Sequence, residues 1–100
     1  MENVINVAIT DDHALFRQGV RTAMGMKKDI NIMFEAENGM QLLNTLKHMQ
    51  PDVILLDVSM PIMDGIATLP EVKKLYPHIK VIMLTMHDES TDRKSTRLNS

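Results

Sequence analysis

Dense apolar runs separated by more polar segments dominate the pattern of this chain. One run extends from Val4 to Ile9 and stops at a polar edge, a second covers Val53 to Leu56, and a third covers Ile79 to Leu84. Apolar runs of this density are typical of strands that are buried on both faces, as in a parallel sheet. We therefore predict three buried strands that end at Thr10, Asp57 and Thr85.

The intervening segments carry apolar residues at helical spacing. Their apolar stripes recur every three or four residues and predict amphipathic helices. A glycine or a proline marks the end of each helix. The predicted helices cover 16–24, 42–49 and 66–75, with Gly25, Pro51 and Pro77 as their end signals.

The segment from Ile30 to Ala36 has a different period. Apolar Ile30, Ile32, Phe34 and Ala36 alternate with mostly polar neighbours, as in an edge strand with one well-covered face. Four strands then alternate with three helices in a βαβ rhythm. Right-handed crossovers turn that rhythm into an α/β fold, a doubly wound parallel sheet.

Composition restricts the class of protein further. A chain of 100 residues suffices for one small domain, and it contains no cysteine, so disulfides and thiolate metal sites are excluded and the cytoplasm is the expected location. The first residues resemble neither a signal peptide nor a membrane anchor. With a net charge of -2, the segment has no electrostatic reason to approach nucleic acid, so we expect no direct DNA binding.

The candidate chemistry lies where the predicted strands end. Parallel strands direct their carboxyl ends to one edge, so Asp11, Asp12, Asp57 and Thr85 should converge. Each aspartate could alone be a helix cap, but together they repel one another and favour a hard cation such as Mg²⁺. Beside that cation, Asp57 could attack a phosphoryl group.

These residues carry a resemblance to a known family. Asp11-Asp12, the segment from Leu56 to Gly65 and Leu84-Thr85 resemble the receiver domain of two-component response regulators, over roughly Val4 to Asp88. The stretches 11–19 and 84–88 further resemble the NarL/FixJ (LuxR-type) subfamily. The resemblance implies a flavodoxin-like (CheY-like) sheet with strand order 2-1-3-4-5.

The resemblance also implies a phosphoacceptor site. Asp57 would receive a phosphoryl group from a sensor histidine kinase. Asp12, Asp57 and the backbone carbonyl of Ser59 would ligate Mg²⁺, while Asp11 would act mainly through a water molecule.

Neighbouring positions would then control the response. Thr85 corresponds to the family's switch hydroxyl, which turns inward to the phosphoryl oxygens. Ser59 and His87 lie at positions that tune hydrolysis of the acyl phosphate. Pro61 and Gly65 fit a loop that turns sharply beside Asp57.

Such a domain is a phosphorylation switch rather than an enzyme. It would regulate transcription through an output domain that is absent from this sequence, and the full-length protein could form a homodimer. Two alternatives stay open. One is a pseudo-receiver or fragment that acts only as a protein-interaction module. The other is a Mg²⁺-dependent aspartyl phosphohydrolase, although Ser59 stands where that chemistry would need a second acid.

The end of the chain departs from the family pattern. A fifth parallel strand with its lysine and a last helix should follow Thr85, but the residues from Asp88 to Ser100 contain a single large aliphatic side chain, Leu98. We expect residues 1–92 to be an incomplete receiver domain and residues 93–100 to be a non-native or disordered tail. The fourth strand would then be an open edge, and the first helix would lack a neighbour.

Overall fold

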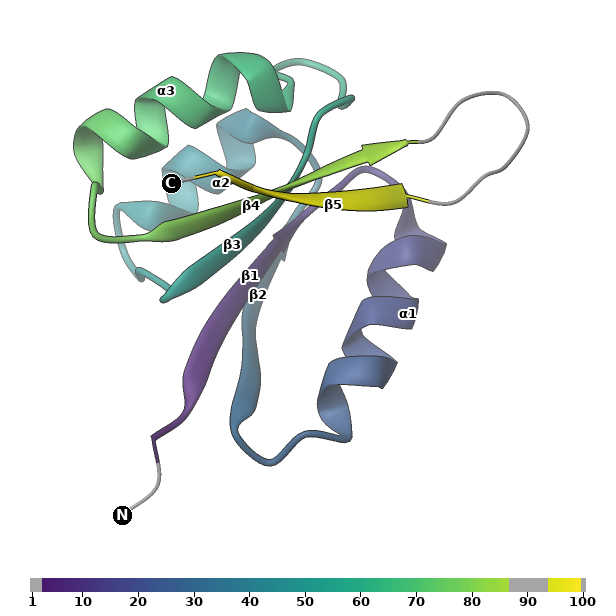
Figure 1. Cartoon of the computed structure of the whole chain (residues 1–100). Coiled ribbons are helices and arrows are strands. Elements are labelled where there is room, and N and C mark those ends of the chain that lie inside the picture. Colours follow the sequence, from purple (N-terminus) through teal and green to yellow (C-terminus); the bar gives the residue numbers. More distant parts are fainter. Residues whose placement is uncertain (1–2, 87–93, 100) are drawn as a thin grey trace.

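The apolar runs become the inner strands of a sheet that separates two layers of helix (Figure 1). The computed structural model describes residues 3–86 and 94–99. The strand order is β2-β1-β3-β4-β5, and β1 to β4 are parallel. The strands are β1 (Ile5–Thr10), β2 (Ile30–Ala36), β3 (Val53–Asp57), β4 (Lys80–Met86) and β5 (Lys94–Asn99).

Each helix begins directly after a polar residue in the loop that follows the preceding strand. α1 follows β1 after a short acidic turn, and the side chains of Asn38 and Asp64 accept hydrogen bonds from Gln41 N and Ala67 N to cap α2 and α3. α2 ends before the predicted position. The helices are α1 (Ala14–Gly25), α2 (Gly39–Leu46) and α3 (Gly65–Leu75).

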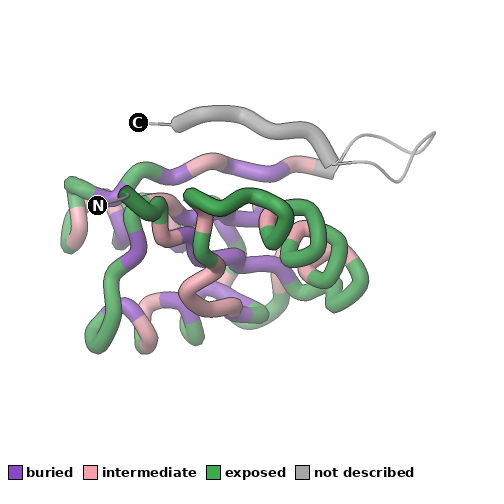
Figure 2. The backbone as a smooth tube through the Cα atoms, turned by 90° about the horizontal axis from the view of Figure 1, so that it is seen from below, coloured by how far each residue is buried: buried purple, intermediate pink, exposed green. Residues whose placement is uncertain are grey.

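The two faces of the sheet are covered unequally. α2 and α3 pack on one face over a cluster of ten buried residues, which includes Leu46, Ile54, Leu56 and Val72. The other face has α1 and a cluster of only four buried residues, and α1 itself contains no buried residue. Buried backbone is accordingly concentrated in the inner strands, whereas α1 is largely exposed (Figure 2). The α1 face is therefore the thinner half of the core.

The last strand corrects the expectation of an open edge at β4. Residues 94–99 form β5, which pairs with β4 in antiparallel orientation from Val81↔Asn99 to Met86↔Lys94. The backbone groups of β4 on that side are thus used in a ladder, although the sequence of the tail lacks a buried-strand pattern. The division of the chain at residue 92 stays a prediction, and His87 lies outside the described residues.

The parallel part of the fold agrees with the sequence. The order β2-β1-β3-β4 places β2 at the edge, as its alternating pattern predicts, and gives the flavodoxin-like arrangement. In the described part of the chain, no helix is long and apolar enough to cross a membrane.

The unequal faces lead to a stability prediction for two valines. Val72 of α3 is fully buried, so Val72→Ala should lower the free energy of unfolding by about 2–3 kcal/mol through lost burial and a residual cavity. Val20 of α1 is half-buried, so Val20→Ala should cost less than about 1 kcal/mol. Urea denaturation of the two variants checks this order. An equal loss in both would mean that α1 packs as tightly as α3.

Candidate functional site

Strand pairing brings the predicted site residues to one edge of the sheet. β1 and β3 run side by side with Thr10 opposite Leu56, so the residues that follow, Asp11 and Asp57, emerge next to each other. Asp57 in turn pairs with Leu84 of β4, which places Thr85 one residue beyond it. Asp11 and Asp57 are buried, and Thr85 is half-buried.

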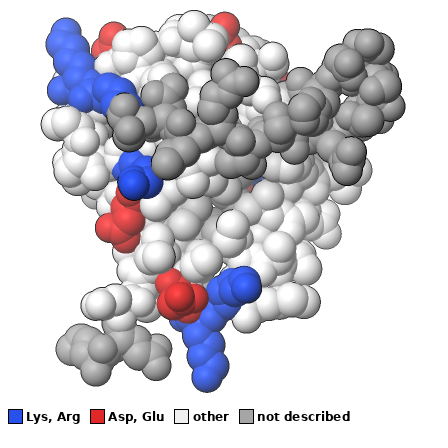
Figure 3. Space-filling view, in the orientation of Figure 1, with Lys and Arg blue, Asp and Glu red and all other residues white. Residues whose placement is uncertain are grey.

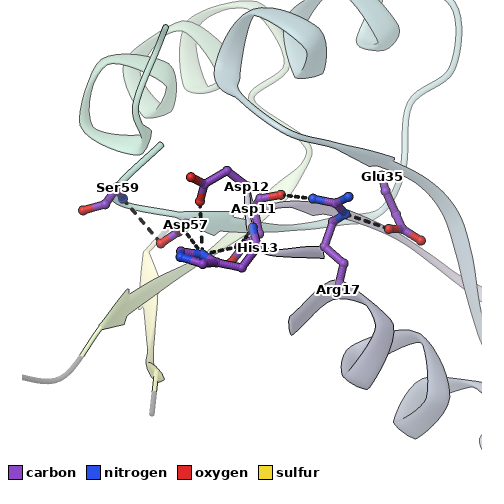
Figure 4. Close-up of polar contacts among 7 residues, drawn as sticks. All are labelled: Asp11, Asp12, His13, Arg17, Glu35, Asp57 and Ser59. Carbon is purple, nitrogen blue, oxygen red and sulfur yellow. Dashed lines mark hydrogen bonds and ion pairs between the residues drawn. The ribbon is translucent and has the colours of Figure 1, made fainter. Parts of the chain in front are cut away.

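A histidine ring lies among the aspartates (Figure 4). His13 Nδ1 is 3.0 Å from Asp11 Oδ1, 3.1 Å from Asp12 Oδ1 and 4.0 Å from Asp57 Oδ2. The backbone N–H of His13 also donates to Asp11 Oδ1 at 2.7 Å. The ring therefore occupies a central position in the cluster and competes with any cation for the same carboxylate oxygens.

The donor set fits a hard divalent cation. One ligand atom from each of Asp11, Asp12, His13 and Asp57 lies within 4.8 Å of the others. Three of these groups are carboxylates, which Mg²⁺ prefers, and two of the carboxylates are buried, where mutual repulsion is least screened. Asp11, Asp12 and Asp57 could hold the ion, which would neutralise their charge.

The loop after β3 keeps its first residues close to Asp57. The backbone N–H of Ser59 lies 3.4 Å from Asp57 Oδ1, a long hydrogen bond, and the Ser59 side chain is exposed. This backbone N–H therefore faces the Asp57 carboxylate. Metal ligation by the Ser59 carbonyl and tuning by its hydroxyl stay predictions.

Gly65 permits a tight return of that loop onto β3. Its N–H donates to the carbonyl of Val58 at 2.9 Å, and a Cβ at this position would collide with the Asp57 carbonyl oxygen and lie 2.9 Å from Val58 Cα. A side chain would therefore push directly on the backbone that carries Asp57. Pro61 is exposed, and Ile62 after it has φ 67, which is unusual for a β-branched residue.

Two residues of the site lay outside the sequence-based prediction. His13 enters the cluster directly, and Arg17 donates from Nη1 to the backbone carbonyl of Asp11 at 2.5 Å. Both lie in the stretch 11–19. His13 follows the aspartate pair and Arg17 lies one helical turn later, so proximity in sequence was the only available signal.

Charges elsewhere on the surface do not form an extended basic patch on the face that Figure 3 shows. Lysine and arginine side chains appear there in small separate groups, with aspartate or glutamate beside several of them. Among the coloured residues of this face, the basic side chains therefore form no continuous track.

Comparison with known families decides the classification. The model of the response regulator receiver domain matches residues 7–97. The chain belongs to the response regulator receiver family. The receiver is 34% identical over 90 residues to the transcriptional regulatory protein DegU of Brevibacillus brevis, where the match covers 90% of this chain and 38% of that protein.

Solved structures agree with this classification. The signal receiver domain of the response regulator NarL from Mycobacterium tuberculosis has a TM-score of 0.78 and 37% identity, and covers 87% of this chain and 70% of that chain. RcsB, solved as two dimers bound to two parallel DNAs, has a TM-score of 0.80 and 33% identity, and covers 85% of this chain and 44% of that chain. The receiver is thus of the NarL/FixJ type, and it spans less than half the length of DegU.

The close approach at Gly65 predicts a destabilised receiver when a methyl group is added. Gly65→Ala should lower the free energy of unfolding by about 1–3 kcal/mol, because the contacted atoms are backbone and cannot rotate away. Gly19→Ala is the matched control. Nothing lies within 4 Å of a Cβ at Gly19 in α1, so this change should stabilise the helix by up to about 1 kcal/mol. Urea denaturation measures both, and stabilisation by Gly65→Ala would contradict the packing described above.

The position of His13 predicts a change in metal affinity. His13→Ala should raise the Mg²⁺ affinity roughly threefold, because it removes a partly exposed hydrogen-bonding group that competes for Asp11 Oδ1. Isothermal titration of the receiver with Mg²⁺ measures the difference. A weaker affinity would instead show that the ring helps to hold the ion.

Proposed function

We propose that this chain is the phosphoacceptor domain of a cytoplasmic two-component response regulator, with Asp57 as the residue that accepts the phosphoryl group. The observation that carries the proposal is the convergence of Asp11, Asp12 and Asp57 at one edge of a receiver fold. Asp57 ends the inner strand β3, is 1% exposed and lies beside the other two carboxylates.

The roles within the cluster are unequal. Asp12 is exposed and can reach a cation directly, and Asp57 contributes an oxygen from the strand end. The Ser59 carbonyl completes the proposed protein ligands, while Asp11 acts mainly through a water molecule. When bound, Mg²⁺ would neutralise the carboxylates and the incoming phosphoryl oxygens.

The chemical step is a phosphoryl transfer to a carboxylate. An Oδ atom of Asp57 forms a bond to phosphorus while the bond between phosphorus and the donor nitrogen or oxygen breaks, and that bond's electron pair leaves with the donor. The product on the protein is an acyl phosphate. Such a transition state requires positioning and charge stabilisation, which a buried and pre-arranged cluster supplies.

The remaining site residues would read or limit this modification. Thr85 lies one residue past the partner of Asp57 in β4, where its hydroxyl can approach a phosphoryl group on Asp57. It is the proposed switch hydroxyl. Ser59 and His87 are proposed to tune hydrolysis, and the turn through Pro61 to Gly65 gives the loop its shape.

The partners follow from the proposed reaction. A sensor histidine kinase would supply the phosphoryl group, and an output domain outside this sequence would act on transcription. RcsB forms dimers on DNA, which supports homodimer formation by the full-length protein. We propose no direct contact of this segment with nucleic acid or with a membrane. It acts as a switch and not as an enzyme.

Acetyl phosphate provides a direct test of the acceptor. With Mg²⁺ and acetyl phosphate, the chain should gain the mass of one phosphoryl group, and Asp57→Asn should gain none because an amide does not form the acyl phosphate. Asp52→Asn is the matched control, since Asp52 lies at the opposite end of β3 and accepts a hydrogen bond from Asn6 N. It should be labelled like the wild type.

The other outcomes separate the alternatives. A chain that folds and gains no adduct would act at most as an interaction module. Sustained turnover of acetyl phosphate without an accumulating adduct would indicate a phosphohydrolase. An adduct that persists in Asp57→Asn would show that another residue is the acceptor.

A further inference from the structure

Arg17 connects the acidic turn to two elements that lie outside it (Figure 4). Its Nη1 donates to the backbone carbonyl of Asp11 at 2.5 Å, and its Nε donates to Glu35 Oε1 at 2.9 Å. Arg17 belongs to α1 and Glu35 to β2, whereas Asp11 follows β1. A single side chain therefore links the first aspartate of the site to the helix and to the edge strand.

The contact is shielded and geometrically demanding. The Arg17 side chain is 14% exposed and Glu35 is 22% exposed, so this pair is better protected from water than an ordinary surface ion pair. A guanidinium presents its donors in a rigid fork, which allows simultaneous donation to a carbonyl and a carboxylate. Arg21 Nη1 binds the other oxygen, Glu35 Oε2, at 2.6 Å, but the Arg21 side chain is 47% exposed, so water can replace this contact.

Both backbone polar groups of Asp11, the N–H and the carbonyl, are hydrogen-bonded. Its N–H donates to the carbonyl of Ala36 at 3.0 Å, and its carbonyl accepts from Arg17. That carbonyl belongs to the peptide group whose nitrogen is the backbone nitrogen of Asp12. Because a peptide group is planar, fixing the oxygen also fixes the direction in which Asp12 leaves the plane. Arg17 thus controls the relative placement of the two neighbouring carboxylates.

We propose that Arg17 is a positioning residue for the Asp11-Asp12 pair and that Glu35 directs its guanidinium. The inference rests on the proposed Mg²⁺ site. Through its positioning role, Arg17 would strengthen Mg²⁺ binding, whereas its positive charge alone would weaken it. A positive group beside the carboxylates repels a cation, so loss of charge alone would raise Mg²⁺ affinity. Loss of positioning lowers it.

The sign of this effect can be measured by titrating the ¹⁵N-labelled chain with Mg²⁺ and following amide shifts by NMR. Arg17→Gln should weaken Mg²⁺ binding by roughly tenfold, the size of effect typical for residues that orient metal ligands. Glu35→Gln should weaken it by a smaller factor and provides a near-isosteric second variant. The Asp11 carbonyl ¹³C resonance should also shift in Arg17→Gln as its hydrogen bond is lost.

Two control variants separate positioning from other effects. Arg21→Gln also removes a positive charge near Glu35 but has no bond to the Asp11 carbonyl, so Mg²⁺ affinity should stay unchanged or rise slightly. Val20→Ala loosens the packing of α1 and should leave affinity within about twofold of the wild type.

Each outcome decides the inference. One outcome is that the wild type binds Mg²⁺ while Arg17→Gln and Glu35→Gln both bind it equally tightly or more tightly. That result would overturn the positioning role of Arg17 and leave the proposed function intact. An equal loss in Val20→Ala would overturn it in favour of α1 packing. No Mg²⁺ binding by the folded wild type would overturn both the inference and the proposed metal site.

Discussion

The convergence of buried carboxylates at the ends of parallel strands is the constraint on which this receiver depends. Strand pairing fixes the backbones of Asp11 and Asp57 side by side, and burial weakens the screening of their repulsion. The protein holds the cluster together with hydrogen bonds from His13 and with the anchored peptide after Asp11. Carboxylates that are kept close together in this way would favour a cation, and the proposed transfer of a phosphoryl group to Asp57 depends on that cation.

The fold around the site is built unequally, and this affects how the site is supported. α2 and α3 cover a large buried cluster that includes residues of β3, so the strand that carries Asp57 is supported by the better-packed half of the core. Asp11 and Asp12 lead into α1, which contains no buried residue. Arg17 and Glu35 supply polar contacts to the acidic turn where apolar packing is thin. The geometry of the site thus depends on packing at one aspartate and on hydrogen bonds at the others.

Most of the fold and the acidic cluster could be predicted from the sequence, because buried strands and amphipathic helices leave strong periodic signals. The edge position of β2 follows from those signals, whereas the strand order was predicted from the resemblance to the receiver family. The contacts of the His13 ring with the aspartates and the bridge through Arg17 could not be predicted, since no periodic pattern marks contacts between polar side chains. β5 was missed because backbone pairing with β4 holds it, and its sequence has no apolar alternation.

Beryllofluoride binding tests the phosphoacceptor site most directly, since this ion imitates a phosphoryl group on a carboxylate. ¹⁹F NMR of the chain with Mg²⁺ and beryllofluoride should show bound fluorine resonances. Amide shifts should concentrate at 11–13, 57–59 and Thr85, and both signals should disappear when Mg²⁺ is removed. A folded chain without bound fluorine, or with shifts away from the carboxyl ends of β1, β3 and β4, would contradict the assignment of Asp57 as the acceptor.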